Sequence, residues 1–551
     1  MNIIIASPRT GRHRLGIRQV LAVTALLLLC VLTATLAASA QEPESARPEL
    51  FVDTIDVRVV QVEVVVVDSS GERVAGLPRE DFRLLVDGAE ATVDYFSEIR
   101  DDLPPAGTTQ AAEPPPGRRL LVFIDDYFTD RRIRKALFDR LLDDVASLGP
   151  RDQMAVVRFD GRQLQLLSGW SGAQQQLQSA IAAAQQLKSR ELDRIAEFGG
   201  LGDPRKKIAL LEDQVKKAAS AVAVAMRSFS EVTGRKLLVL ISSGWPYDAA
   251  DALSPEDVLD TPNAPNPFNI DRSLSDQELT FGDNPILASV RGTELLEPVV
   301  STANLLGFTI YPTHLALSGF STPESSNLNR FGVVKRSQVN RDSLRYLAEE
   351  TGGRFLAYAL VKKDPPLELV VDDTRSYYSL GFSPQLQGDD QNHEIRVEVR
   401  QPGLKVRHRQ GYQDVSRTAQ ATLATEAALL LGSGGEPLDV TLGSPQRAGR
   451  GLLELPITLR IPMDWATSLP TQVKGQYLAA LQLRVAAVDT SGRRSEMPII
   501  PIRLGGPKPS PGSYATYDTH VQIRRQKQTL VLSLYDQLSG ELLTRTIEFA
   551  P

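Results

Sequence analysis

Acidic and hydroxyl side chains that could do chemistry follow an unbroken apolar run in the first half of the chain. The run Leu120 to Ile124 ends in Asp125 and Asp126, and Tyr127 and Thr129 come directly after them. Carboxylate and hydroxyl oxygens are ligands that Mg²⁺ and Ca²⁺ prefer, and a strand-end aspartate can also attack a phosphoryl group as a nucleophile. The third alternative is structural, because Asp125 can simply accept hydrogen bonds from the first backbone N–H groups of a helix.

The spacing of apolar residues predicts the elements that position these side chains. A run that is apolar on both faces is typical of a strand buried in a parallel sheet. A helix with Thr129 or Asp130 as its N-cap is predicted by apolar residues at intervals of three and four, namely Ile133, Leu137, Leu141, Val145 and Leu148. Strand, acidic loop and helix in this order place Asp125 at the carboxyl edge of an open α/β sheet, where such folds bind ligands.

Strands and helices alternate from Arg118 to residue 365, which predicts a doubly wound α/β sheet of six strands. The tight turn at Asp160 and Gly161 predicts an antiparallel pair between residues 153–159 and 163–167. Further strands are expected at 237–241, 308–311 and 354–357, and further helices at 177–187, 204–233, 297–306 and 341–350.

An apolar strand that ends in Asp-x-Ser-x-Ser is the signature of von Willebrand factor type A (VWA) domains, whose metal-ion-dependent adhesion site holds a divalent cation with these residues. The sequence Asp125-x-Tyr127-x-Thr129 resembles this motif at its first and last positions. The resemblance implies a VWA fold, with Asp125, Thr129 and Ser243 as the ligands of a degenerate site for Mg²⁺ or Ca²⁺.

Two departures from the family motif argue against a working metal site. The Tyr127 phenol lies a full ring farther from the backbone than a serine hydroxyl. The usual Thr-Asp-Gly after the fourth strand is Ser242-Ser243-Gly244, which removes a carboxylate, although Asp126 or Asp248 could compensate. We therefore expect Asp125 to be a helix cap and no cofactor to bind, with Mg²⁺ or Ca²⁺ at the degenerate site as the alternative.

The segments on both sides of this region resemble one branch of the family, the exported VWFA-related proteins common in acidobacteria. The run Tyr377-Tyr-Ser-Leu-Gly-Phe-Ser-Pro384, followed by the alternating run His393 to Val399, carries most of this likeness. The expected domains are an immunoglobulin-like β-sandwich at 41–103, a proline-rich linker at 104–117, the VWA domain at 118–365, a closing antiparallel β-ribbon at 366–415 and a C-terminal β-sandwich at 416–551.

The first 40 residues have the features of a secretory signal peptide. Four arginines precede the apolar stretch Val20 to Leu36, and Ala38-Ser39-Ala40 fits an A-x-A cleavage site. An uncleaved membrane anchor is the alternative. We expect a mature chain that begins at Gln41 and is exported to the periplasm or secreted by a bacterium, with no membrane span left after cleavage.

The charge and the cysteine content of the chain argue against two classes of function. The chain has 61 basic and 67 acidic residues, and cleavage of the signal peptide would leave 57 basic against 67 acidic, a formal net charge of −10. This acidic balance argues against non-specific binding of nucleic acid. The single cysteine, Cys30, lies in the signal peptide, so the mature chain would have neither disulfide bonds nor a thiol nucleophile.

One class of enzyme stays open as an alternative, because the strand end also resembles the Asp-x-Asp-x-Thr of haloacid dehalogenase-type phosphatases. Asp125, Thr129 and Ser242 would fit that pattern, but Tyr127 stands where the general acid should be. The sequence has neither the H-E-x-x-H nor the G-x-S-x-G motif. We expect no catalysis.

The expected function is binding or scaffolding of an unidentified envelope or extracellular protein. Two long loops, Trp245 to Gly292 and Ser318 to Asn340, follow strands at the same sheet edge as Asp125. The first loop carries carboxylates that suit a basic patch on a partner, namely Asp248, Asp251, Glu256, Asp257 and Asp260. A metal-dependent adhesin is the alternative within this class.

Overall fold

The computed structural model describes residues 59–100, 117–129, 131–190, 197, 201, 203–230, 234–246, 292–316, 340–359, 366–384, 388–432, 437–471, 473–490 and 492–551. Contacts between residues gather 55–469 and 477–551 into one unit. The expected signal peptide, nearly all of the proline-rich linker, and most of both long loops, including Asp248, lie outside the described residues.

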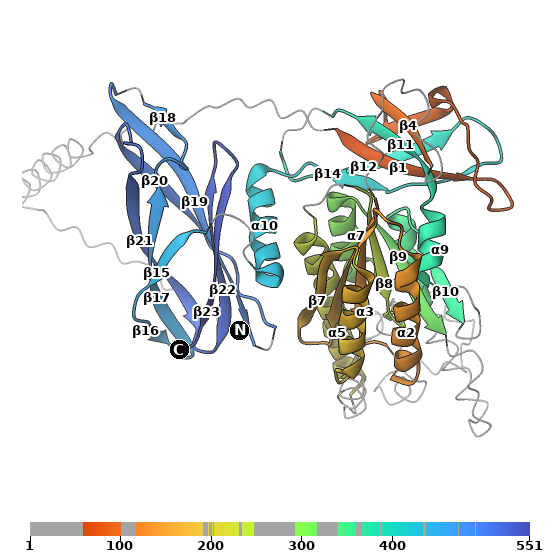
Figure 1. The fold of residues 1–551 in the computed structure, drawn as a ribbon, viewed down its shortest axis with the longest axis horizontal. Helices are drawn as coiled ribbons and strands as arrows, with labels where there is room; N and C mark the ends of the chain where they lie inside the picture. The colour runs from red at the N-terminus through yellow and green to blue at the C-terminus, as the bar shows by residue number, and fades with distance from the viewer. Residues whose placement is uncertain are drawn as a thin grey trace, which may run out of the picture. The chain divides into compact units, whose positions relative to one another are not determined.

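A six-stranded sheet lies at the centre of the α/β domain (Figure 1). Its strands are β5 (Arg119–Asp125), β6 (Gln153–Phe159), β7 (Leu164–Ser171), β8 (Lys236–Ile241), β9 (Phe308–Ala316) and β10 (Leu356–Ala359). Their order is β10-β9-β8-β5-β6-β7, and every neighbouring pair is parallel except β6 and β7. The six strands and the antiparallel edge pair predicted from the sequence are thus confirmed.

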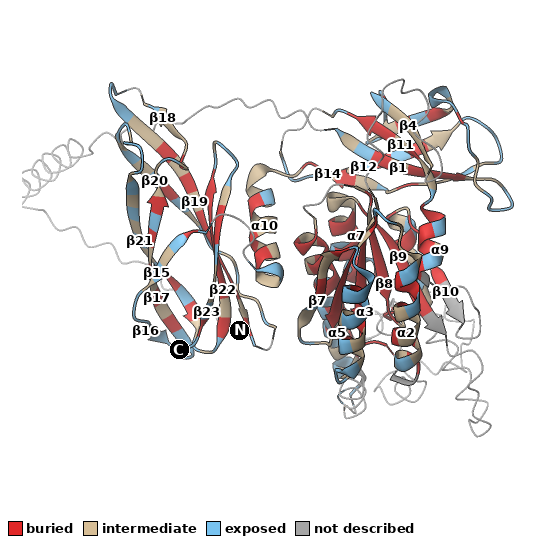
Figure 2. Cartoon of the chain, in the orientation of Figure 1, coloured by how far each residue is buried: buried red, intermediate tan, exposed pale blue. Residues whose placement is uncertain are grey.

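Helices cover both faces of this sheet because each strand sends alternate apolar side chains to opposite sides. In β5, Leu121 and Phe123 belong to the core shared with α5, α7 and a helix over 340–350, whereas Leu120, Val122 and Ile124 belong to the core shared with α2, α3 and α9. Figure 2 shows the strands buried between these layers. The helices are α2 (Arg131–Asp144), α3 (Gln174–Gln186), α5 (Pro204–Ser228), α7 (Gly292–Leu306) and α9 (Pro366–Asp373), and a 3-10 turn, Val145–Ser147, extends α2.

Two helix boundaries differ by five residues from those predicted. The α7 helix begins five residues before the predicted start at Glu297, because the buried residues Leu295 and Leu296 extend its apolar face, and Pro298 lies inside the helix. The α5 helix begins at Pro204 as predicted, with Asp203 as its N-cap, but ends at Ser228. Among the described helices, none combines the length and apolar character needed to cross a membrane.

The largest correction concerns the segments before and after the α/β domain, which form one β-sandwich instead of a sandwich and a separate ribbon. One sheet has the order β13-β1-β11-β4 and the other β14-β12-β2-β3, so each sheet contains two strands from each segment. The strands are β1 (Val60–Val67), β2 (Phe82–Val86), β3 (Ala89–Ala91), β4 (Tyr95–Arg100), β11 (Ser376–Phe382), β12 (Asn392–Val399), β13 (Lys405–Arg407) and β14 (Gly411–Gln413), with a 3-10 turn at Arg79–Asp81.

This split sandwich has a physical reason in the burial of its strands. Val64 of β1 pairs with Tyr378 of β11, and Leu84 of β2 pairs with Val397 of β12, and all four side chains lie in one apolar cluster. Strands 60–100 alone would leave the apolar faces of β1 and β2 without neighbours. The α/β domain is therefore inserted into the sandwich, between β4 and β11.

The last part of the chain contains a helix and a second pair of sheets, in agreement with the expected C-terminal β-sandwich. Helix α10 (Arg417–Leu431) begins at the N-cap Ser416, whose hydroxyl accepts a hydrogen bond from the backbone N–H of Ala419 at 3.1 Å. The strands that follow are β15 (Asp439–Leu442), β16 (Gln446–Gly449), β17 (Leu452–Pro462), β18 (Ser468–Pro470), β19 (Gln476–Asp489), β20 (Ile499–Pro507), β21 (Tyr514–Arg524), β22 (Gln528–Asp536) and β23 (Leu542–Phe549).

Candidate functional site

The carboxylate of Asp125 lies at the carboxyl end of the central strand β5 and is fully buried. Its Oδ1 accepts hydrogen bonds from the backbone N–H groups of Tyr127 at 3.2 Å and Phe128 at 3.1 Å. Its Oδ2 accepts hydrogen bonds from the Ser242 hydroxyl at 2.7 Å and the Trp245 indole N–H at 2.8 Å. Each oxygen thus receives two donors from the protein itself.

These four donors carry no charge, and their effect on the pKa of Asp125 is smaller than that of burial. Burial raises the pKa of Asp125, and the hydrogen bonds from Trp245, Ser242 and the two backbone N–H groups offset part of that increase. A carboxylate has about four acceptor positions, and here all of them point at donors of the chain. The side chain therefore holds two strand ends and a loop together.

The side chains of Thr129 and Tyr127, the other two residues of the expected metal motif, make contacts within the chain. The Thr129 hydroxyl donates a hydrogen bond to the backbone oxygen of Asp125 at 2.6 Å, so it closes the turn after β5. The ring of Tyr127 is buried and packs edge-on against Phe128 and Phe159. A side chain on Gly161, whose φ is +89°, would collide with that ring, so this hairpin turn requires glycine.

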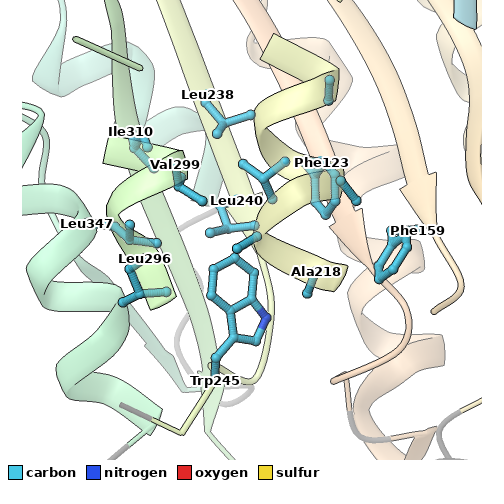
Figure 3. Close-up of a cluster of buried hydrophobic side chains, with 14 of the residues drawn as sticks. Phe123, Phe159, Ala218, Leu238, Leu240, Trp245, Leu296, Val299, Ile310 and Leu347 are labelled. Carbon is cyan, nitrogen blue, oxygen red and sulfur yellow. The ribbon is translucent and has the colours of Figure 1, made fainter. Parts of the chain in front are cut away.

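The serine that contacts Asp125 is Ser242, which the phosphatase alternative named, and the half-buried Ser243 follows it. The next turn brings Trp245 back under the sheet edge, where its indole ring lies beside Leu240 and Leu296 in Figure 3. The Trp245 backbone N–H donates to the Ser343 hydroxyl at 3.3 Å, which ties this loop to the helix at 340–350.

Asp126 is not available to compensate for missing metal ligands, because two arginines hold its fully buried carboxylate. Arg134 donates to Oδ1 through Nε at 2.7 Å and to Oδ2 through Nη2 at 2.9 Å. Arg158 donates to Oδ2 through Nε at 2.7 Å. Such charge-assisted, partly bidentate bonds are among the strongest polar contacts in proteins.

Asp126, Arg134 and Arg158 together carry one surplus positive charge. Backbone carbonyl groups at the end of α3 balance it. Arg134 donates to the carbonyl oxygens of Ala184 and Leu187, and Arg158 donates to the carbonyl oxygen of Lys188. Carbonyls at a helix C-terminus carry partial negative charge and lack partners within the helix. Asp126 thus links β5 and β6 to the end of α3.

The donor set does not fit a divalent cation. Mg²⁺ needs several oxygen ligands in near-octahedral geometry, but both oxygens of Asp125 and of Asp126 are already bonded, and the Thr129 hydroxyl bonds to the backbone. Within the described residues, no group of three or more His, Cys, Asp or Glu side chains is placed to hold a metal ion. Asp248, the remaining ligand expected from the sequence, lies outside them.

The sequence did not single out Trp245, Arg134 or Arg158. Arg158 had a visible cue, because it is a charged residue inside the apolar strand β6 and so requires a buried partner. Trp245 had a weaker cue as the first residue after the Ser-Ser-Gly turn. Its contact with Asp125 joins residues 120 positions apart, which no local pattern specifies.

Another buried carboxylate, that of Asp373 at the end of α9, is surrounded by arginine side chains. Arg407 Nη2 lies 2.9 Å from Oδ1 and 3.0 Å from Oδ2, and Arg73 Nη2 lies 3.3 Å from Oδ1. The Tyr311 hydroxyl donates to Oδ2 at 2.8 Å. Burial by itself would raise the pKa of Asp373, but the arginines reverse the effect and the pKa is lowered.

This cluster lies at the amino edge of the sheet, opposite Asp125. Arg118, directly before β5, donates to the carbonyl oxygen of Val371 at 3.1 Å. Arg235, directly before β8, donates to the carbonyl oxygen of Thr374 at 3.3 Å and forms an ion pair with Glu63 of β1 at 2.5 Å. Charged side chains therefore join the α/β domain to the split sandwich at this edge.

Comparisons with known proteins give no family for this chain. No protein-family model matches it, and no curated protein sequence matches it either. Solved structures do match, and their similarity to this chain is low.

Three of these structures illustrate the range. A von Willebrand factor type A protein from Catenulispora acidiphila is 12% identical, with 82% of this chain and 72% of that chain covered at a TM-score of 0.20. The pilus adhesin SpaC from Lactobacillus rhamnosus GG is 11% identical, with 85% and 60% covered at 0.25. A beta-glucuronidase from Bacteroides uniformis is 10% identical, with 32% and 19% covered at 0.15. The chain thus spans less than two thirds of the length of the last two proteins.

Proposed function

We propose that this chain is an exported, non-catalytic VWA-domain protein that binds or scaffolds another protein of the bacterial envelope. The Asp125-x-Tyr127-x-Thr129 sequence and the doubly wound sheet with one antiparallel edge strand support the family. In this proposal the loops at the carboxyl edge contact the partner. The role of Asp125 is to keep this edge of the sheet in a fixed conformation.

The observation that carries the proposal is the set of four hydrogen bonds on Asp125. A nucleophile or a metal ligand needs a free lone pair, whereas the Asp125 oxygens accept from Tyr127, Phe128, Ser242 and Trp245. Binding a cation there would require at least the Trp245 indole to leave a fully buried position. These contacts favour a structural Asp125 over both the metal-dependent adhesin and the phosphatase.

Thermal unfolding with and without cations tests the metal part of the proposal. A cation bound only by the folded chain, at 100 times its dissociation constant, would stabilise it by about 2.7 kcal/mol. We expect no shift in Tm with Mg²⁺, Ca²⁺ or EDTA in the wild type. A rise in Tm that disappears in Asp125→Asn and persists in Asp342→Asn, which removes an exposed carboxylate, would favour the metal-dependent adhesin.

Hydrolysis of p-nitrophenyl phosphate tests the catalytic part. We expect the wild type to release no more nitrophenol than Asp125→Asn does, because the Asp125 oxygens that would attack phosphorus are bonded to donors. Turnover that is present in the wild type and lost in Asp125→Asn would establish the phosphatase instead.

Partner capture tests the role of the first long loop. Envelope proteins would be captured with the wild type, with a chain lacking 248–290, and with a length-matched chain whose five loop carboxylates, from Asp248 to Asp260, are amides. The deletion spares Trp245 because that residue is part of the core. We expect a partner to be lost from both variants, and equal capture by all three chains would refute binding through this loop.

A further inference from the structure

A cavity of about 760 Å³ lies away from the Asp125 site, and no step of the proposed function uses it. Its walls come from the β6–β7 turn, the middle of α5, the end of α10 and the strand ends around Asp489 and Gln528. Small-molecule sites in proteins commonly have volumes of 300 to about 1,000 Å³. The cavity is therefore large enough for a small ligand.

The side chains that line this cavity are strongly biased toward positive charge. Six are basic, namely Arg162, Lys216, Lys217, Arg493, Arg494 and Lys527, and two are acidic, Asp489 and Glu548. The whole chain has a formal net charge of −6, so a six-to-two excess of basic residues runs against its composition. Positive charge concentrated at a cavity attracts anions.

Contacts inside the chain already neutralise part of this charge, and they identify the residues that are left to act on a ligand. Asp489 accepts hydrogen bonds from Arg524 at 2.7 Å and Gln526 at 2.6 Å, and Arg493 lies 3.4 Å from it. Lys217 pairs with Asp213 at 2.5 Å. Lys216 and Lys527 are exposed, and no acidic partner is found for either within the described residues.

The cavity is also lined by apolar side chains. Phe159 and Leu164 reach it from the hairpin, Val224 from α5, Leu430 from α10 and Val488 from β19. An inorganic anion would leave these side chains without a partner, whereas a hydrocarbon chain would remove their surface from water, at about 25 cal/mol per Å². A lining that is partly basic and partly apolar thus matches a ligand with a charged part and a hydrocarbon part.

Close contacts hold the two walls of the cavity together. The Gln163 side-chain amide donates a hydrogen bond to the backbone oxygen of Thr490. Gly492 has a φ of +81°, and a Cβ there would come within 1.9 Å of the Arg162 carbonyl oxygen, so no other residue permits this approach. The cavity therefore depends on a specific fit between the hairpin turn and the loop before Arg493.

From these features we infer that the cavity binds an amphiphilic anion, in which a carboxylate or phosphate head contacts Lys216 and Lys527 and a hydrocarbon tail contacts the apolar side chains of the lining. Added salt screens the exposed lysines and so weakens the binding of the head group, whereas the contribution of the tail to the affinity stays the same. The carboxylate of a fatty acid and the phosphate of a lipid share this chemistry.

Isothermal titration calorimetry of the whole chain with decanoate and with decyl phosphate, below their micelle concentrations, tests the inference. We expect at least one of the two to bind, and to bind at least tenfold more weakly to the Lys216→Glu, Lys527→Glu double variant. The matched control is the Lys206→Glu, Arg525→Glu double variant, which reverses two exposed charges on α5 and beside Lys527 that do not line the cavity. Its affinity should stay within twofold of the wild type.

The same titration separates the sources of the ligand and shows how the inference fails. Decanoate bound at least tenfold more tightly than decyl phosphate would indicate a fatty acid, and the reverse order a phosphate-bearing lipid. Decyl maltoside, which has the tail without the charge, should bind at least tenfold more weakly than the better anion. The inference is wrong if neither alkyl anion binds, if inorganic phosphate binds as tightly, or if both double variants lose affinity equally.

Discussion

The two edges of the central sheet bury an aspartate in opposite ways. At the carboxyl edge, Asp125 is surrounded by neutral donors, two of them backbone N–H groups and two the side chains of Ser242 and Trp245. At the amino edge, Asp373 contacts the guanidinium groups of Arg407 and Arg73. Burial raises the pKa of Asp125, whereas the arginines lower that of Asp373.

The difference shows which of these two aspartates depends on charged partners. Around Asp373, each ionised group needs the others, because an isolated charge in the interior is far less stable than a paired one. Around Asp125, the donors satisfy the carboxylate without adding charge, so burial still disfavours its ionised form. The adjacent Asp126 differs from Asp125, because Arg134 and Arg158 pair with its carboxylate. The ion pairs at the amino edge join two domains.

The largest effect is expected from breaking the charged edge. Asp373→Ala would leave Arg407 and Arg73 without their carboxylate, and removal of one partner from a buried ion pair costs about 3–5 kcal/mol. Urea unfolding followed by circular dichroism would measure this loss. The matched control is Asp372→Ala, which removes an exposed carboxylate paired with Arg375 on the same helix and should change stability little. Equal effects of the two variants would contradict the comparison.

A third aspartate sharpens the comparison through its pH dependence. Asp144, at the end of α2, accepts a hydrogen bond from the Leu367 backbone N–H at 3.4 Å, and its Oδ1 accepts none from the described residues. Burial raises the pKa of Asp144 to about 7, with Arg140 lowering it and Asp143 and Glu368 raising it. Asp144 thus lacks the arginine contacts that Asp373 has and the four hydrogen bonds that Asp125 has.

The raised pKa of Asp144 fixes the direction of its effect on stability. Between its ordinary pKa near 4 and the folded value of about 7, the folded chain binds more protons than the unfolded chain, so stability falls as pH rises through this window. Each unit of the shift corresponds to about 1.4 kcal/mol. We expect Asp144→Asn to flatten the decrease in unfolding free energy between pH 5 and 8, and an unchanged slope would refute this assignment.

The smallest of these effects is expected at Asp125, whose four donors are neutral. Trp245→Phe keeps an aromatic ring in the core but removes one donor from Asp125, and a buried carboxylate that loses a hydrogen bond costs about 1–3 kcal/mol. The same change should raise the pKa of Asp125 further, so the loss of unfolding free energy should grow as pH rises.

Trp170→Phe is the matched control for Trp245→Phe. Trp170 packs edge-on against Phe229, and a phenylalanine preserves that contact. No hydrogen bond of its indole nitrogen is found with the described residues, so no donor is lost from a carboxylate. A pH-dependent loss in both variants would mean that it does not arise from the bond to Asp125.

The sequence by itself determined the elements whose cause is local. The apolar residues from Leu120 to Ile124 predict a strand buried on both faces, and the turn at Asp160 and Gly161 predicts an antiparallel pair, and both are found. The sequence also predicted the start of the α5 helix at Pro204. Each of these predictions uses residues that lie close together along the chain.

Only the tertiary structure decided what joins distant residues. The strands β1 and β11 pair with each other although the whole α/β domain separates them in the sequence. Local patterns do not specify which strands pair. Two segments that the sequence assigned to separate domains therefore form one sandwich. The same reason explains the site. Which of the adjacent residues Ser242 and Ser243 contacts Asp125 depends on the path of the chain after β8, and only the folded core brings the Trp245 indole to the same carboxylate.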